Sequence, residues 1–373
     1  MRIALLSYST KPRGGVVHTL ALAEALADLG HDVTVWTLAR DGDADFFRPV
    51  DPRVQKRVVP FPPDPDEDVG PRILRSIRTL AQAFEPHRYD IVHAQDCISA
   101  NAVPRCVRTI HHLDHFTTPE LAACHEKAIL QPYAHVCVSP AVAEEVEAGW
   151  GIHPVVIPNG VAAHRFEAAE GSISAASWRR RLGRYVLAVG GIEPRKGSLD
   201  LLESFSRLND PDLELVIAGG ETLFDYRDYR AKWDRLAGDL GIHPQVFGSV
   251  DHDDLPGLVA GASVFAMTST KEGFGLAAME ALAAGVPVVA RDLPVLRELF
   301  GGIAWLADSP PEFARGLRAL LDRPDENRKQ AGQKHARRYT WQAAAHAHLQ
   351  LYETLLASGT GTSPDSAGRQ HIS

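Results

Sequence analysis

The fold class of this chain follows most directly from one segment, Glu272-Gly273-Phe274-Gly275-Leu276-Ala277-Ala278-Met279-Glu280, and from its surroundings. The apolar run Ala262–Met267 has the length and composition of a buried parallel strand, while Leu276–Ala284 consists of good helix formers and ends at Gly285. The chain therefore turns from strand into helix at the glycines of this segment. Such a turn leaves backbone N–H groups and the positive end of a helix dipole exposed, so we predict a binding site for an anion or for a set of hydroxyl groups.

Two carboxylates stand at the ends of this segment. Glu272 and Glu280 are eight residues apart, which is about 2.2 turns of α-helix. Glu280 is therefore expected on the same side as the start of the helix but deeper, where the pair could hold two parts of one elongated ligand. A capped surface helix with an incidental glutamate at each end is the alternative, and it leaves the other motifs of the chain unexplained.

Strand-like and helix-like segments alternate along most of the chain. Helical patterns such as His18–Leu29 and Ala141–Ala148 separate short apolar runs that we predict to be strands: Ile3–Ser7, Val33–Leu38, Ile91–His93, Thr109–His111, His135–Ser139, Val155–Pro158, Tyr185–Gly190, Leu213–Ala218, Val246–Phe247, Val264–Met267, Val286–Ala290 and Ile303–Trp305. This alternation predicts an α/β architecture of parallel sheets covered by helices on both faces. The length of 373 residues suits two such domains. Ligands of doubly wound sheets bind at the carboxyl ends of the strands, so we expect the site in a cleft between the domains.

The segment 272–280 resembles the E-x7-E signature of the family 4 retaining glycosyltransferases, which have the GT-B fold. Four further segments resemble, in the expected order, the family's first strand with its glycine loop, its interdomain hinge, its phosphate loop and the strand after the signature: Met1–His18, Val156–Val161, Val186–Gly197 and Gly285–Ala290. The resemblance extends over nearly the whole chain, to about residue 357. It implies two Rossmann-like, doubly wound parallel-sheet domains that face an interdomain cleft.

The resemblance also implies domain boundaries. Residues 1–160 are expected to form the acceptor-side domain and residues 161–340 the domain that binds a nucleotide-sugar donor. In the resembled family the last helix, here at about 341–357, packs back on the first domain. The polar segment Ala162–Arg184 is expected to be a linker after the hinge, and residues 359–373, which lack bulky apolar side chains except Ile372, are expected to be disordered.

The expected phosphate loop contains adjacent cations. Arg195 and Lys196 follow a strand and precede a helix, a placement that suits a diphosphate. By resemblance, Lys196 is the family's phosphate-binding lysine. The family commonly has an arginine directly after the first glycine of this loop, at the position of Gly191 in this chain. Either Arg195 takes over the role of that arginine, or its charge is lost.

The two glutamates suit the two polyols of a nucleotide sugar. One carboxylate can accept hydrogen bonds from both vicinal hydroxyls of a ribose, and the resemblance gives this role to Glu280. It gives Glu272 the hydroxyls of the transferred sugar, with the backbone N–H groups of Phe274, Gly275 and Leu276 nearby.

The first domain has a second glycine loop, in which Gly14 and Gly15 allow the backbone to approach a ligand closely. By resemblance, these glycines lie near the phosphates and the acceptor, and His111 lies near the transferred sugar. The cluster His111–His115 also has the residue types of a metal site. We favour metal-free chemistry, because enzymes with this fold usually stabilise the leaving group with cations and helix dipoles, and we expect no cofactor besides the nucleotide-sugar co-substrate.

These features favour a retaining transferase that moves a hexose from a nucleotide diphosphate to an unidentified small-molecule or glycan acceptor. A nucleotide-sugar epimerase of the same fold and a non-catalytic sugar-nucleotide-binding protein are the alternatives. A glycosidase also uses paired carboxylates, but it has no use for a basic phosphate loop. No G-x-G-x-x-G follows a predicted strand, which weighs against a dinucleotide oxidoreductase.

Composition limits the partners. A net charge of −8 argues against broad nucleic-acid binding. No run of eighteen apolar residues exists, the N-terminal apolar stretch suits a strand rather than a signal peptide, and the four cysteines include no C-x-x-C pair. We therefore expect a cytoplasmic protein with buried, reduced thiols. Arg72, Arg75 and Arg78 share a helix face, for which a solvated stripe is favoured over peripheral membrane contact.

Overall fold

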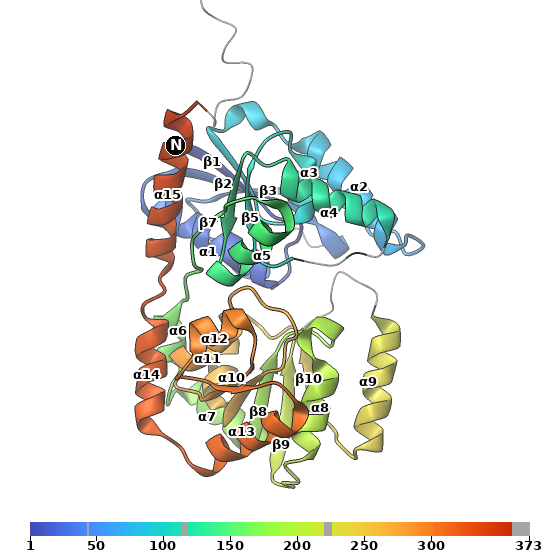
Figure 1. Cartoon of the computed structure of the whole chain (residues 1–373), viewed down its shortest axis with the longest axis vertical. Coiled ribbons are helices and arrows are strands. Elements are labelled where there is room, and N and C mark those ends of the chain that lie inside the picture. Colours follow the sequence, from blue (N-terminus) through green and yellow to red (C-terminus); the bar gives the residue numbers. More distant parts are fainter. Residues whose placement is uncertain (43–44, 114–115, 117, 220–225, 360–373) are drawn as a thin grey trace, which may run out of the picture. The chain divides into compact units, whose positions relative to one another are not determined.

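A computed structural model describes residues 1–42, 45–113, 116, 118–219 and 226–359 of the chain. The chain divides into two compact units, in which unit 1 is Met1–Gly160 with Trp341–Ser373 and unit 2 is Val161–Thr340. Each unit is a single parallel sheet with helices on both of its faces (Figure 1). The predicted α/β class with two parallel-sheet domains is therefore confirmed. Beyond Gly359, the tail predicted to be disordered lies outside the described residues.

Unit 1 contains a seven-stranded sheet of order β3-β2-β1-β4-β5-β6-β7, in which every neighbouring pair is parallel. From β1 the chain first builds the sheet towards β3 and then crosses to the other side of β1 at β4, so the sequence order reverses between β1 and β4. Ligands of such sheets bind outside the carboxyl ends of the strands at this reversal. The elements of the unit are β1 (Arg2–Leu6), α1 (Gly14–Asp28), β2 (Asp32–Ala39), β3 (Gln55–Pro60), α2 (Val69–Ala83), β4 (Ile91–Ala94), α3 (Cys97–Ala102), β5 (Val107–Ile110), α4 (Pro119–Leu130), β6 (Ala134–Cys137), α5 (Pro140–Trp150), β7 (Val155–Val156) and α15 (Trp341–Ala357).

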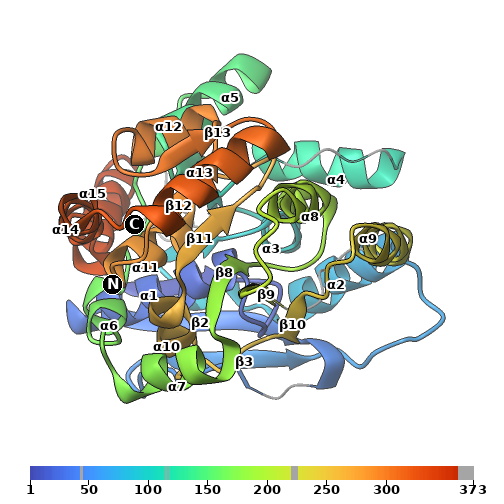
Figure 2. The same cartoon turned by 90° about the horizontal axis from the view of Figure 1, so that it is seen from below.

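Unit 2 contains a six-stranded sheet of order β10-β9-β8-β11-β12-β13, again parallel throughout, with its reversal between β8 and β11. Helices α8 and α13 cover one face, and α10 and α11 cover the other (Figure 2). The elements of the unit are α6 (Ala163–Glu167), α7 (Ile173–Leu182), β8 (Arg184–Val189), α8 (Ser198–Ser206), β9 (Leu213–Ala218), α9 (Arg227–Asp239), β10 (Gln245–Gly248), α10 (Leu255–Gly261), β11 (Val264–Met267), α11 (Leu276–Ala283), β12 (Val288–Arg291), α12 (Pro294–Phe300), β13 (Trp305–Ala307), α13 (Pro310–Asp322) and α14 (Glu326–Ala336).

Two sequence-based expectations are wrong. The segment Ala162–Arg184 is not a linker, because it forms α6 and α7, which pack against α10 and α11, and its Phe166 is fully buried. The strand β3 was not predicted. It is an edge strand of charged and half-exposed residues, Gln55-Lys56-Arg57-Val58-Val59-Pro60, and charged residues on an edge discourage pairing with other chains but hide the apolar pattern.

The C-terminal helix α15 belongs to unit 1, where it packs against α1 and adds side chains to the core of the unit: Ala344, Ala345, Leu349 and Tyr352. The buried hydroxyl of Tyr352 lies 2.6 Å from Nδ1 of His93, whose Nε2 lies 2.7 Å from the hydroxyl of Thr109. Helix and sheet are thus linked by satisfied buried polar groups. His93 therefore packs in the core of unit 1.

No helix in the described ranges combines the length and the apolar character needed to cross a bilayer.

The arginine stripe of α2 is partly engaged within unit 1. Arg75 donates to Glu67 at 2.7 Å and lies 3.9 Å from the ring centre of Phe61. Cys106 and Cys137 are buried free thiols, and Cys97 and Cys124 are half-buried.

The start of α15 leaves no room for a side chain at position 160. A Cβ added to Gly160 would lie 2.3 Å from the backbone nitrogen of Trp341 and 2.5 Å from its Cα. Because both atoms belong to the backbone, we expect Gly160→Ala to displace α15 and to lower the free energy of unfolding by about 1–3 kcal/mol. Urea denaturation measures this change. Gly149→Ala, in α5 with no neighbour within 4 Å, is the control and is expected to stabilise by up to about 1 kcal/mol. Equal stability of Gly160→Ala and the parent protein would contradict the clash.

Candidate functional site

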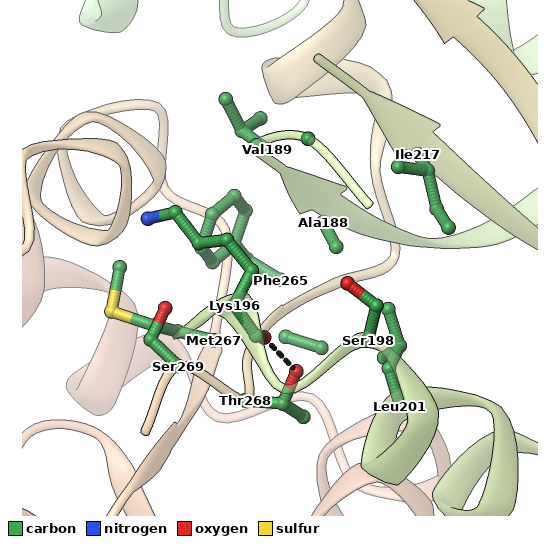
Figure 3. A pocket seen from close by; sticks show the side chains of 13 residues that line it. Ala188, Val189, Lys196, Ser198, Leu201, Ile217, Phe265, Met267, Thr268 and Ser269 are labelled. Carbon is green, nitrogen blue, oxygen red and sulfur yellow. Dashed lines mark hydrogen bonds between the residues drawn. The ribbon is translucent and has the colours of Figure 1, made fainter. Parts of the chain in front are cut away.

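Two loops meet at the reversal of the sheet in unit 2. The phosphate loop (Gly190–Gly197) follows β8, and the signature loop (Thr268–Gly275) follows β11. The backbone N–H of Thr270 donates to the carbonyl of Arg195 at 2.8 Å, and the hydroxyl of Thr268 donates to the carbonyl of Lys196 at 2.9 Å (Figure 3). The two loops are therefore fixed to each other through main-chain carbonyls of the phosphate loop, as expected for a site at this edge.

Two glycines make this contact sterically possible. Gly197 has φ +62°, and a Cβ there would lie 2.1 Å from the carbonyl oxygen of Thr268. Gly190 has φ +144°, and a Cβ there would lie 3.0 Å from Cε of Lys196. The first glycine lets the two backbones touch, and the second leaves room for the lysine side chain across the end of the strand.

Lys196 lies at the end of the short 3₁₀ turn Pro194–Lys196 and lines a pocket together with Gly190, Gly191 and Ser269 (Figure 3). Its ammonium donates to Oε1 of Glu272 at 2.6 Å. The structure thus brings the predicted phosphate-binding lysine and the first glutamate of the signature together, with Gly191 in the same pocket.

Cations fix the charge of Glu272. Burial raises the pKa of this carboxyl, but the charges of Lys196 and Arg195 and hydrogen bonds from Lys196 and Ser269 outweigh burial and lower the pKa to about 2. Arg195 donates to Glu193 at 3.0 Å, and its Nη1 lies 3.8 Å from Glu272. Glu272 is therefore ionised at any physiological pH, and Arg195 lies within reach of two carboxylates.

Glu280 is in a different state. It lies on α11, which starts after Gly275 with φ +81°, and it is half-buried. In the described part of the chain its side chain forms no hydrogen bond. Burial raises its pKa from the ordinary 4.5 to about 7, and the charge of Arg165 on α6 offsets this only in part. Glu280 therefore has unused acceptor capacity and exchanges a proton near neutral pH.

The residues at the start of α11 contribute main chain rather than side chains. The ring of Phe274 is buried and packs edge-to-face on Tyr339, with 5.5 Å between ring centres. Leu276 is the first residue of the helix. The backbone N–H groups at this helix start have no carbonyl partner within the helix, so they are suited to donate hydrogen bonds to a ligand oxygen.

The candidate residues of unit 1 also lie together. Gly14 and Gly15 begin α1, which starts four residues before the predicted His18, and His111 follows β5 directly. A Cβ on Gly15 would lie 3.7 Å from the imidazole of His111. The Nε2 atom of His111 is buried and has no hydrogen-bond partner among the described residues. Burial, with the nearby charges of His112 and Arg108, lowers the pKa of His111 to about 3, so its imidazole is neutral.

The alternative metal site at His111–His115 falls partly on Asp114 and His115, which lie outside the described residues. Within the described ranges no group of three or more histidine, cysteine, aspartate or glutamate side chains is arranged to hold a metal ion. Asp96 caps α3 and accepts hydrogen bonds from the backbone of Ser99 at 2.8 Å and of Tyr8 at 2.9 Å.

Sequence reasoning missed two arginines of unit 2. Arg165 is the cation whose charge acts on Glu280. Arg291, buried at the end of β12, donates to the carbonyls of Thr268 and Asp308, each at 2.9 Å, and is paired with Asp200. It thereby braces the base of the signature loop. Neither residue belongs to a local motif, and the only hint in the sequence is a charged residue directly after the apolar run Val286–Ala290.

Comparison with protein families agrees with this division of the chain. Residues 177–338 match the model of the glycosyl transferases group 1, and residues 12–165 match the model of glycosyltransferase family 4. The two matches lie almost wholly in unit 2 and unit 1, respectively.

Individual proteins are similar over nearly the full length. The chain is 29% identical over 392 residues to a phosphatidyl-myo-inositol mannosyltransferase from Mycobacterium tuberculosis, covering 96% of this chain and 98% of that protein. Among solved structures it is similar to sucrose-phosphate synthase from Thermosynechococcus elongatus, with a TM-score of 0.79, 20% identity and coverage of 96% of this chain and 99% of that one. It is also similar to HepE from Anabaena in complex with UDP-glucose, with a TM-score of 0.71, 20% identity and coverage of 96% and 100%.

The raised pKa of Glu280 predicts a pH-dependent stability. Since its pKa is about 7 in the folded protein against an ordinary 4.5, the folded state holds a proton that the unfolded state has lost. The stabilising contribution is complete below pH 4.5 and disappears as pH rises through 7. We expect Glu280→Gln to be more stable than the parent protein at pH 8 and to lose this advantage towards pH 5, as measured by urea denaturation. Exposed Glu144→Gln on α5 is the control, and a pH-independent difference for Glu280→Gln would contradict the assignment.

Proposed function

The chain belongs to the GT-B glycosyltransferases, and from that premise we propose that it transfers a hexose from a nucleotide diphosphate sugar to an acceptor with retention of configuration. The observation that supports this most strongly is the Lys196–Glu272 pair at the sheet reversal of unit 2. The ammonium of Lys196 lies 2.6 Å from Oε1 of Glu272, and in this proposal the ammonium binds the phosphates while the carboxylate accepts from sugar hydroxyls.

In the proposed donor complex, the diphosphate lies against Lys196 and Arg195, and the ribose diol lies against Glu280. Glu272 accepts hydrogen bonds from hydroxyls of the transferred hexose, next to the helix start at Gly275. The complex of the similar protein HepE with UDP-glucose supports a nucleotide-hexose donor. Similarity to a mannosyltransferase supports transfer of a hexose. Binding of a diol to Glu280 favours its ionised form, because a carboxylate accepts both hydroxyl protons.

The resemblance of the segment 272–280 to the signature of the retaining family supports retention, and the lack of a free nucleophile at Glu272 argues against a double displacement. A double displacement requires a carboxylate that can attack the anomeric carbon. Glu272 is ionised, but its Oε1 is already bonded to Lys196 and is also near Arg195. We therefore propose that the acceptor attacks on the face from which the diphosphate leaves, and that a phosphate oxygen takes the acceptor proton.

Stabilisation of the leaving diphosphate is the main catalytic effect in this proposal. Negative charge grows on the phosphates as the sugar bond breaks, and preorganised donors stabilise it most effectively. Lys196, Arg195 and the first N–H groups of α11 supply the positive charge that stabilises the leaving diphosphate, so the reaction is proposed to be independent of a metal ion. The neutral imidazole of His111 can donate or accept one hydrogen bond to a sugar hydroxyl without changing its charge.

The proposed function is tested by following a donor in water. Thermal shift against UDP, GDP and ADP selects the nucleotide, because a ligand at 100 times its dissociation constant stabilises by about 2.7 kcal/mol. NMR of slow hydrolysis of the matching hexose donor, in excess chelator, is expected to show the sugar first released with the donor's own anomeric configuration. Release of the opposite anomer would contradict retention, and loss of activity on chelation would contradict metal independence. An epimerised donor would indicate an epimerase, and binding without any turnover a binding protein.

The roles of the two cations of the phosphate loop are separable by mutation. Because their contacts strengthen as charge develops, we expect Lys196→Ala and Arg195→Ala each to lower the rate constant by about 10²–10³, with a smaller effect on donor affinity. Gly191→Arg is expected to restore part of the rate of Arg195→Ala if the two positions serve one role. Exposed Arg207→Ala after α8 is the control for loss of a cation. Normal turnover of Arg195→Ala would show that Lys196 and the helix start suffice.

A further inference from the structure

Three arginines lie together at the carboxyl edge of the sheet in unit 1, where the strand order reverses between β1 and β4. Arg13 precedes α1, Arg40 follows β2 and Arg72 lies on α2. We call these three residues the arginine cluster. The guanidinium carbons of Arg40 and Arg13 lie 5.3 and 5.9 Å from the ring centre of Tyr8, which follows β1. Residues far apart in sequence therefore bring like charges to one place.

Arg40 is the member of the cluster that the fold explains least. It is 8% exposed, and its Nη2 donates to the hydroxyl of Ser76 at 2.6 Å. Its Nε is buried and has no hydrogen-bond partner in the described ranges, and within them Arg40 forms no ion pair. Burial lowers the pKa of Arg40 to about 10, and the like charges of Arg72 and Arg13 act in the same direction. Tyr8 and Asp96 act on this pKa in the opposite direction. A buried guanidinium beside two other cations is costly for folding, and a bound anion would lower that cost.

Asp96, an acid at the same edge of the sheet, already accepts several hydrogen bonds. Asp96 accepts hydrogen bonds from the backbone and hydroxyl of Ser99, at 2.8 and 2.9 Å, and from the backbone of Tyr8 at 2.9 Å. Burial raises the pKa of Asp96. Asp96 therefore links the segments that follow β1 and β4, and the groups of Ser99 and Tyr8 already occupy its carboxylate oxygens.

Other polar groups at the same edge have unmet hydrogen bonds. Both amide atoms of Gln95 and the hydroxyl of Thr10 are buried without a partner among the described residues. Gln95 follows β4 and is 2% exposed, and Thr10 follows β1 and is 1% exposed. Buried amides and hydroxyls in folded proteins nearly always have partners. These groups are suited to the hydroxyls of a polar ligand that also has a negative charge.

We propose that this edge of unit 1 binds the acceptor, and that the acceptor has a phosphate group held by Arg13, Arg40 and Arg72. This inference rests on the proposed transferase function and adds the substrate class. Three guanidinium groups from separate elements suit a tetrahedral phosphate better than a carboxylate, which offers two oxygens in one plane and a single charge. The phosphate belongs either to a soluble ester or to a lipid headgroup.

The test measures binding of inorganic phosphate to the full chain saturated with the donor nucleotide, so that the donor site is occupied. We expect saturable binding by isothermal titration, weakened by about 10- to 100-fold in Arg40→Gln and Arg72→Gln, the loss typical of a charged hydrogen bond. Exposed Arg78→Gln, six residues further along α2, is the matched control and is expected to bind phosphate normally. Arg72 is half-buried, so its variant remains informative if Arg40→Gln does not fold, and the nucleotide thermal shift reports folding of each variant.

Competition then identifies the source of the phosphate. Displacement of inorganic phosphate by glucose 6-phosphate would indicate a soluble ester, and displacement by phosphatidylcholine vesicles containing phosphatidylinositol would indicate a lipid headgroup. Displacement by neither, or wild-type phosphate binding by both cluster variants, would overturn the inference. Donor hydrolysis separates the two proposals. Hydrolysis without phosphate binding leaves the transferase function intact and refutes the acceptor class, whereas phosphate binding without any donor turnover refutes the transferase function itself.

Discussion

The main-chain contact between the phosphate loop and the signature loop holds the candidate donor site together. The N–H of Thr270 is bonded to the carbonyl of Arg195, and a left-handed Gly197 lets the two backbones touch. Because this contact fixes the two loops, the ammonium of Lys196 lies 2.6 Å from Oε1 of Glu272. The site is thus an outcome of backbone packing at the reversal of a parallel sheet, which places two unrelated loops side by side at its carboxyl edge. Side-chain chemistry is added to a geometry that the main chain already defines.

The carboxyl groups of the two glutamates in the signature segment have pKa values shifted in opposite directions. Lys196 and Arg195 keep Glu272 ionised, with a pKa of about 2, whereas burial with little compensation raises the pKa of Glu280 to about 7. The spacing of the motif cannot produce this difference, since both side chains belong to the same turn and helix. Desolvation and neighbouring charge determine it. In the proposed donor complex the two side chains therefore have different tasks, in which Glu272 is a permanent acceptor and Glu280 gains its charge when ribose hydroxyls donate to it.

Most of the fold could be predicted from the sequence because buried parallel strands are short apolar runs between helical patterns, and this signal is local. Prediction failed for segments that are buried on one face only, and for contacts between residues far apart in the sequence. The edge strand Gln55–Pro60 has no apolar run, and the polar surface of Ala162–Arg184 hid two packed helices. In the site, the structure brings Lys196 of one predicted motif to Glu272 of the other, but Arg165 and Arg291 act on the site across gaps of more than twenty residues. No local pattern encodes such contacts, because only the packed fold brings these arginines to the loops.

The distribution of charge between surface and interior has a functional logic. The chain has a net charge of −8, which repels large polyanions at long range, yet both units concentrate cations at the carboxyl edges of their sheets. A cation in a partly dry pocket attracts a small anion far more strongly than the same cation in water, since the effective dielectric constant is lower there. Pairing Lys196 with Glu272 in advance also limits the cost of desolvating the lysine, because its charge already has a partner. In the proposed donor complex, exchange of that partner for a phosphate oxygen would require a small movement of one side chain rather than reorganisation of the loop.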